Sequence, residues 1–194
     1  ALLAPGGTLA ASLVATPRGT EGPFYPDRLP LDRDNDLTRV DGRDGSAQGT
    51  ILDLAGHVRT ISGGAVPGAR LEIWQCDANG VYLHSASSSR RPIDPNFQGY
   101  GSTIAHSDGG YRFRTIVPVP YPGRTPHIHL KLTAPNGREL VSQIYIAGHP
   151  MNDGDFLYSR LAEEAARKAS EVELAPIPEM SGAGAKGRFE IVLQ

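Results

Sequence analysis

The sequence has one cysteine, no long apolar run and almost no net charge. Because Cys76 is the only cysteine among the 194 residues, no disulfide can form within the chain, and we interpret it as a structural thiol. No stretch reaches the roughly 18 uninterrupted apolar residues that a membrane span needs. With 19 Lys and Arg against 21 Asp and Glu, the formal charge is −2, which argues against a basic surface for nucleic acid or membranes.

Glycine and proline are abundant instead. The 23 Gly and 16 Pro make up about a fifth of the chain, which is typical of short strands joined by turns. The length fits one domain with a sizeable core. Several runs alternate between apolar and polar residues, and only residues 156–172 show near-helical spacing. We therefore predict an all-β fold, an antiparallel β-sandwich with a long N-terminal arm and one short helix in the C-terminal half.

Turn residues predict where the strands reverse. Asn-Gly, Gly-Gly and Pro-Asn-Gly sequences favour three hairpins, with tips at residues 77–80, 107–110 and 135–137. Residues 19–44 contain several prolines and show no clear period, so we expect an extended arm over the surface. The terminal run GRFEIVLQ predicts a final strand.

The stretch VPYPGRTPHIHLKL, residues 119–132, combines two imidazoles, a phenol and Arg124. In a strand, residues two apart face the same way, so His127 and His129 would share one side while Ile128 and its alternating neighbours enter the core. Two parallel imidazoles can bind one metal ion. The alternative is a pair of exposed histidines in a hairpin.

The oxygen donors near these histidines are phenols. No carboxylate occurs between Tyr111 and Lys131, whereas zinc normally takes Cys, His or carboxylate ligands. A phenolate has a high proton affinity and needs a hard, highly charged ion to form at neutral pH, and ferric iron is such an ion. Tyr121 lies between Pro120 and Pro122, which restrict the backbone that would aim it.

Several motifs together resemble the intradiol ring-cleaving dioxygenases. Within that family the chain is most similar to the beta-type chains of protocatechuate 3,4-dioxygenases and their smaller bacterial relatives. The resemblance runs from about Thr20 to Leu193. It rests on six segments that recur in the same order, namely TEGPFYP, VPGARLEIWQCDANGVYLH, DPNFQGYG, SDGGYRFRTIVPVPYPGRTPHIHLKL, LVSQIYIAG and RFEIVL.

The resemblance implies a non-haem Fe(III) centre in this chain. The family holds the ion with two tyrosines and two histidines, which correspond by motif to Tyr82, Tyr121, His127 and His129. Of the two tyrosines, Tyr121 is the one implied to leave the metal when substrate binds.

Two further residues acquire implied catalytic roles. Arg124 matches the family arginine that stabilises charge developing on the substrate ring, and Gln143 matches a glutamine beside the substrate. The implied reaction inserts both atoms of O2 into a catechol-type diol between its hydroxyl-bearing carbons and gives a cis,cis-muconate-type diacid, as in aromatic hydrocarbon catabolism.

The implied partners are a small aromatic diol and O2, with no nucleic acid and no membrane span, in a homo-oligomer that is a dimer or larger. The chain departs from the best-known members in two places. Those members have a tryptophan after the tyrosine-proline pair, where this chain has Gly123, and the loop of this chain from Tyr121 to His127 is short. These departures predict a more open pocket and leave the ring substituent undefined.

Residues 1–18 form an apolar segment ahead of the predicted catalytic domain at residues 19–194. Two interpretations remain open for it. The small-residue spacing before Thr16 suits the end of a secretory signal, which predicts export to the periplasm or outside the cell. A mature arm that packs on another subunit would instead be compatible with a cytoplasmic protein.

Two other functions remain open as well. A non-catalytic β-sandwich binding module would need none of the four ligand residues. A zinc or copper enzyme with a His-x-His site would use both histidines but would leave the tyrosines without a role.

Overall fold

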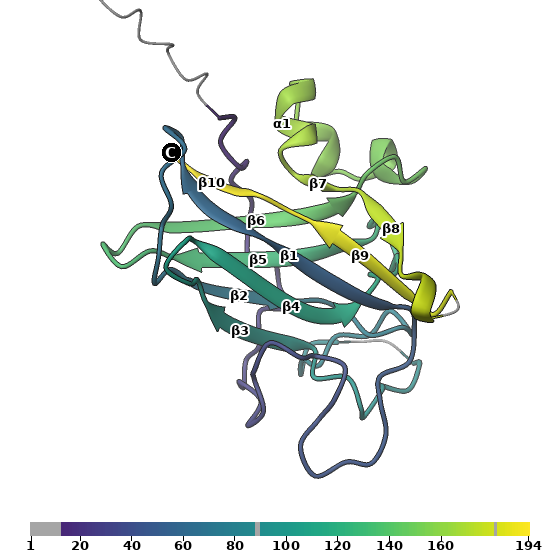
Figure 1. Ribbon diagram of the computed structural model, residues 1–194. Helices are drawn as coiled ribbons and strands as arrows, with labels where there is room; N and C mark the ends of the chain where they lie inside the picture. Colours follow the sequence, from purple (N-terminus) through teal and green to yellow (C-terminus); the bar gives the residue numbers. More distant parts are fainter. Residues whose placement is uncertain (1–12, 88–89, 181) are drawn as a thin grey trace, which may run out of the picture.

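The chain forms two β-sheets packed face to face, as the computed structural model shows (Figure 1). The structure describes residues 13–87, 90–180 and 182–194. The first sheet contains β1 (Ile51–Thr60), β4 (Gly110–Ile116), β8 (Leu174–Pro176), β9 (Gly184–Arg188) and β10 (Ile191–Leu193). The second contains β2 (Arg70–Trp74), β3 (Tyr100–Ile104), β5 (His127–Thr133), β6 (Glu139–Ile146) and β7 (Glu171–Val172). The predicted all-β sandwich is confirmed.

Strand β1 is the centre of the first sheet. It pairs antiparallel with β4 and parallel with β9 and β10. The second sheet has the order β3-β2-β5-β6-β7 and is antiparallel except for the β6–β7 pair. The sheets are therefore mixed, because the chain returns after β6 to add short parallel strands to both of them.

The core lies between the sheets and follows the two-residue period of the strands. Leu52, Leu54 and Val58 of β1 face it, and so do the apolar residues of β5. Ile128 and Leu130 have no exposed surface, which confirms the side predicted for them. Burying each such side chain stabilises the fold by about 1.5–3 kcal/mol.

The other face of the second sheet is buried too. Trp74 and Cys76 of the β2 region form a second cluster there, with the arm residues Phe24 and Tyr25 packed against it. The predicted arm is thus confirmed as a cover, and it gives the sheet two buried faces. Burial raises the pKa of the Cys76 thiol to about 12, which keeps it protonated and suits a structural role.

One of the three predicted hairpins is confirmed. Strands β5 and β6 pair in register around the turn at residues 134–137. The turn at 77–80 forms, but no strand follows it, because β2 already has β3 and β5 on its two edges. The turn at 107–110 joins β3 to β4, which lie in different sheets.

Helix is shorter than the spacing over residues 156–172 suggested. Within residues 13–87, 90–180 and 182–194 there is one α-helix, α1 (Glu164–Lys168), and it buries no side chain. Short 3-10 turns occupy η1 (Asn152–Gly154), η2 (Tyr158–Arg160) and η3 (Pro178–Met180). The backbone leaves helical geometry at Leu161, where ψ is 86°. Because α1 has no apolar face buried against the rest of the protein, tertiary packing does not stabilise a longer helix here.

The N-terminal segment is described only from residue 13. Backbone N–H groups of Leu13, Thr16 and Gly19 donate to Ile61, Val192 and Val141, so residues 13–19 run along both sheets. The predictions for residues 1–12 fall outside the described residues, and the boundary near residue 18 stays a prediction. Among the described helices, none has the length and apolar character to cross a membrane.

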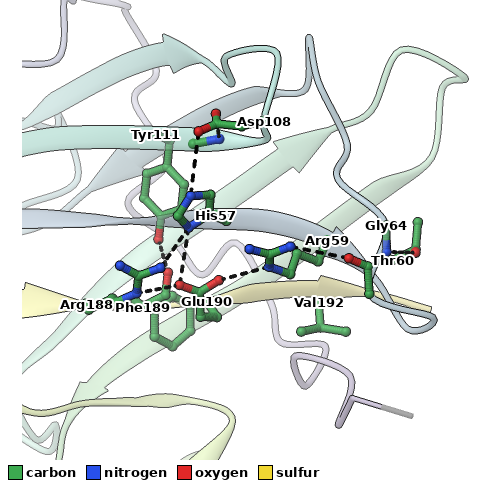
Figure 2. Close-up of polar contacts among 12 residues, drawn as sticks. His57, Arg59, Thr60, Gly64, Asp108, Tyr111, Arg188, Phe189, Glu190 and Val192 are labelled. Atoms are coloured by element: carbon green, nitrogen blue, oxygen red, sulfur yellow. Dashed lines mark hydrogen bonds and ion pairs between the residues drawn. The ribbon is translucent and has the colours of Figure 1, made fainter. Parts of the chain in front are cut away.

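Ion pairs cover the outer face of β1 near its pairing with β10 (Figure 2). The Glu190 carboxylate accepts from Arg188 Nε at 2.8 Å, and it lies 3.5 Å from Arg59 Nε and 3.4 Å from His57 Nδ1. Partly exposed pairs of this kind contribute about 0.2–1 kcal/mol each. His57 is therefore part of a surface ion-pair network.

Gly56 lies in β1 where the chain between β9 and β10 passes closely. A Cβ atom there would lie 1.8 Å from the carbonyl oxygen of Phe189. The same oxygen accepts a hydrogen bond from Tyr111 Oη at 2.6 Å (Figure 2). The backbone approach at this point requires the absence of a side chain.

Gly56→Ala is expected to lower the free energy of unfolding by roughly 2 kcal/mol or more, because backbone must move to admit the methyl group. Urea unfolding followed by circular dichroism measures the loss. Gly154→Ala is the matched control, because a Cβ there meets nothing within 4 Å. Equal stabilities for the two variants would contradict the close approach.

Candidate metal and catalytic site

Four aromatic rings form a closed circle on the arm-covered face of the second sheet. Neighbouring ring centroids are 5.5 Å apart for Tyr82–Tyr121, 5.5 Å for Tyr121–His127, 4.8 Å for His127–His129 and 6.1 Å for His129–Tyr82. These are the four residues proposed as ligands from the sequence, and the fold brings all of them together.

Strand β5 places the two histidines. They share the side opposite the core, as predicted, but they are buried, with exposures of 2% for His127 and 1% for His129. Trp74, the cross-strand partner of His129 on β2, stacks on its ring at 4.9 Å and 10°. The site is thus enclosed, which the prediction of a polar strand face did not foresee.

The hydrogen bonds of His127 define its tautomer. Its Nδ1 lies 2.7 Å from the carbonyl oxygen of Thr125, which can only accept, so Nδ1 carries the proton and Nε2 has a free lone pair. That Nε2 lies 3.2 Å from Nε2 of His129. Burial lowers the pKa of His127 to about 4 and that of His129 well below its usual value, so both rings are neutral at pH 7.

The loop that carries Tyr82 is organised by Asp77. The Asp77 carboxylate, 1% exposed, accepts from the N–H groups of Asn79 and Val81 through Oδ1 and from Asp94 N–H through Oδ2. Tyr82 Oη is buried and has no hydrogen-bond partner among the described residues. Burial raises the pKa of this phenol well above its usual value.

Tyr121 lies in the loop before β5 and is less enclosed. A turn closed by the Arg124 N–H on the Tyr121 carbonyl holds its backbone, with Gly123 in the left-handed region at φ 82°. Burial raises the pKa of Tyr121, while the nearby Arg124 guanidinium opposes the rise. The Tyr121 phenol thus has a positive charge next to its oxygen.

A cleft of about 470 Å³ opens over the two tyrosines. Phe24 of the arm forms one wall and stacks on Tyr82 at 4.6 Å and 18°. Gly123 also lines the cleft, and a Cβ there would meet nothing within 4 Å, in keeping with the open pocket expected from this position.

Arg124 is buried beside the circle of rings. Its Nη1 donates to Tyr121 Oη at 3.4 Å and its Nη2 to Gln143 Oε1 at 2.5 Å. Gln143 Oε1 also accepts from Tyr145 Oη at 2.9 Å, and its Nε2 has no partner among the described residues. Both residues proposed as catalytic thus lie next to the tyrosines and contact each other.

Asp155 holds Arg124 in place. Its Oδ2 accepts from Arg124 Nε at 2.7 Å and from Thr125 N–H at 3.0 Å, while Oδ1 accepts from the N–H groups of Leu157 and Tyr158. Burial opposes ionisation of this carboxyl, but the surrounding donors outweigh it and lower its pKa. The carboxylate therefore compensates the buried guanidinium.

Three residues of the site were not predicted. Placing Trp74 beside His129 requires knowledge that β2 pairs with β5, which the sequence does not give. Phe24 lies in the motif TEGPFYP, which has no alternating pattern that would indicate where its side chain points. For Asp155 the sequence offers no signal, because it comes from a loop 31 positions after Arg124.

The donors fit a hard trivalent ion. The 3.2 Å separation of the two Nε2 atoms is close to that of adjacent ligands about 2.1 Å from one ion. The Tyr82 hydroxyl is a buried polar atom without a partner, which a metal bond would satisfy. Within the described residues, no group of three or more His, Cys, Asp or Glu side chains could hold a metal. The oxygen atoms available beside the two histidines are the phenols of Tyr82 and Tyr121.

Comparison with known proteins gives the site a family context. The sequence model of the family Dioxygenase_C, described as "Dioxygenase", matches residues 20–194. The protocatechuate 3,4-dioxygenase beta chain of Burkholderia cepacia is 34% identical over 170 residues, which cover 83% of this chain and 72% of that protein. The chain belongs to the intradiol dioxygenase family. It is therefore an oxidoreductase of the dioxygenase class.

Other relatives of this intradiol dioxygenase differ in their named substrates. Hydroxyquinol 1,2-dioxygenase of Corynebacterium glutamicum is 31% identical over 216 residues, covering 96% of this chain and 67% of that protein. The dioxygenase domain of a dioxygenase carbohydrate-binding protein fusion from Streptomyces sp. SirexAA-E superposes with a TM-score of 0.71 at 30% identity. That comparison covers 93% of this chain and 99% of the domain.

Asp155→Asn is expected to lower the free energy of unfolding of this dioxygenase by about 3 kcal/mol at pH 7, because it leaves a buried arginine uncompensated. The folded-state pKa of Asp155 lies below its unfolded value. Its contribution is therefore complete above about pH 4 and is lost as the pH falls further. Urea unfolding of both proteins between pH 7 and pH 3 should show the difference shrinking below pH 4.

Asp153→Asn provides the control for this pair. Its side chain is 90% exposed and lies 3.8 Å from Arg167, so the variant should differ from the wild type by less than about 1 kcal/mol. A similar effect of both substitutions, or a difference at Asp155 that does not depend on pH, would contradict the role of the Asp155 charge.

Proposed function

We propose that Tyr82, Tyr121, His127 and His129 bind Fe(III), and that the protein cleaves a catechol-type diol with O2 between its two hydroxyl-bearing carbons. The observation that carries this proposal is the closed circle of two phenols and two neutral imidazoles around one point. Bound iron would supply Lewis acidity toward the diol and draw electron density from its ring. The product would be a cis,cis-muconate-type diacid, and residues 19–194 would form the catalytic unit.

The two tyrosines would have different tasks. Tyr82 is 4% exposed, stacked under Phe24 and held in a loop built on Asp77, so it suits a permanent ligand. Tyr121 is partly exposed at the cleft, and its oxygen is 3.4 Å from Arg124 Nη1. Tyr121 would give way to the incoming diol and take one of its protons on Oη, after which the phenol stays hydrogen-bonded to Arg124.

Arg124 would then act on the substrate through charge. A guanidinium with a fixed orientation stabilises negative charge that develops on the substrate ring and its oxygens. Because the guanidinium is already in place, it does not have to reorient during the reaction. Asp155 and Gln143 provide that orientation through Nε and Nη2. The unpartnered Nε2 of Gln143 would donate to a substrate hydroxyl.

The substrate class follows from the relatives and from the cleft. Relatives are named for catechol, hydroxyquinol and protocatechuate, which share two adjacent ring hydroxyls. A cleft of about 470 Å³ admits one such ring.

The two alternative functions are less well supported by the site. A zinc or copper site would take the histidines but would leave the buried Tyr82 hydroxyl without a partner. A binding module would have no need to bury Arg124, Asp155 and four converging donors, since such groups are expensive to desolvate. The family resemblance implies self-association, which size-exclusion chromatography with light scattering would measure.

Tyr121→Phe is expected to lower kcat for catechol roughly 100-fold, because the variant loses both the exchangeable phenolate and its proton acceptor. Oxygen uptake with catechol measures the rate. The visible absorption band of tyrosinate-bound iron should weaken or shift in the same variant. The far-ultraviolet circular dichroism should be unchanged.

Tyr111→Phe is the control for loss of a buried phenol. Its hydroxyl binds the Phe189 carbonyl in the other sheet, so rate and colour should match those of the wild type. Unchanged colour and turnover in Tyr121→Phe would rule out Tyr121 as a ligand.

A further inference from the structure

A second cavity lies on the same face of the sheet as the rings, beyond Gln143. It has a volume of about 280 Å³ and is formed by the arm, β6 and the η2 region. We name it the Arg18–Arg160 cavity. Its polar lining residues include Arg18, Ser142, Gln143, Tyr145, Arg160 and Ser170.

The charges of this cavity are of one sign. Arg18 comes from the arm and Arg160 from η2, and no Asp or Glu is among the lining residues. Within the described chain, neither arginine makes an ion pair, whereas Arg124 nearby is paired with Asp155. Both side chains are exposed, and two guanidinium groups without an ion pair at one cavity favour a ligand with carboxylate groups.

The hydroxyl groups of Ser142, Ser170 and Tyr145 already donate within the protein, whereas Gln143 Nε2 is a neutral donor without a partner among the described residues. Ser142 Oγ donates to the Pro17 carbonyl at 2.7 Å, Ser170 Oγ to the Arg167 carbonyl at 2.7 Å, and Tyr145 Oη to Gln143. Recognition of carboxylate charge would therefore depend on the two arginines, and Gln143 Nε2 could add one neutral donor. Apolar surface from Leu157 and Leu161 suits the carbon chain between two acid groups.

The cavity is connected to the catalytic arginine in two ways. Gln143 lines it and accepts from Arg124 Nη2 at 2.5 Å. The guanidinium carbons of Arg160 and Arg124 lie 6.0 Å and 5.3 Å from the centre of the same ring, that of Phe156. A ligand that draws Arg160 toward the cavity would disturb both the Phe156 ring and Arg124.

We propose that the Arg18–Arg160 cavity is a second binding site for a small dicarboxylate, the chemical class of the ring-cleavage product, and that its occupation slows catalysis through Arg124. The identity of the natural ligand as product rests on the proposed function. The carboxylate site itself rests only on the arginines and the shape of the cavity.

The binding test uses adipate, a saturated six-carbon dicarboxylate, with isothermal titration calorimetry on the full chain and without catechol. Adipate should bind saturably, and hexane-1,6-diol, its uncharged analogue, should not. The double variant Arg18→Gln/Arg160→Gln should weaken adipate binding by about tenfold or more, because two charge-assisted contacts are lost. Arg43→Gln, which lines a different cavity, should bind as the wild type does.

The kinetic test separates this cavity from the diol cleft. Adipate should lower kcat for catechol with KM unchanged in the wild type and in Arg43→Gln, and should have little effect on the double variant. The proposal is overturned by adipate binding that survives in the double variant, by inhibition that raises KM alone, or by binding without any effect on kcat. Because the titration needs neither iron nor turnover, its failure is distinct from failure of the proposed reaction.

Discussion

The rest of the structure depends on the two-residue alternation of β5 between two buried environments. One side of the strand sends Ile128, Leu130 and Leu132 into the sandwich core, and the other sends His127 and His129 to the arm-covered face. A shift of one residue would exchange the two sets, so the core packing itself fixes where the imidazoles point. The pairing of β5 with β2 and β6 then adds Trp74 and Gln143 directly opposite His129.

Burial gives these donors their chemical character. Burial lowers the pKa values of the two imidazoles, so they stay neutral. Burial raises the pKa of the Tyr82 phenol, so it stays protonated. In the proposed site, an ion of high charge would be needed to displace the phenol protons. Arg124 adds a positive charge beside Tyr121, and Asp155 compensates that charge away from the cleft. This positive charge beside Tyr121 suits the proposal that Tyr121 is the tyrosine that gives way to the substrate.

The sequence allowed prediction of the features that depend on short-range pattern. Alternation assigned the faces of β5, and the Pro-Asn-Gly turn defined the β5–β6 hairpin. Tyr121, His127 and His129 were singled out from the sequence pattern itself, whereas Tyr82 was proposed only from motif resemblance, because nothing local marks it. Features that depend on tertiary pairing were not predictable. No strand directly follows the turn at residues 77–80, and the turn at 107–110 joins strands of different sheets. The helical spacing over residues 156–172 gives only the 3-10 turn η2, which ends at Leu161, and the short helix α1. Asp155 reaches Arg124 from a loop with no signal of its own.

A visible absorption spectrum of the purified, iron-loaded protein tests the central claim most directly. It should be recorded without oxygen, before and after addition of catechol, with iron content measured on the same sample. Phenolate-bound Fe(III) predicts a broad red-brown band that moves to longer wavelength when catechol is added. A protein that remains colourless after ferric reconstitution, or a band that does not respond to catechol, would contradict the proposed site.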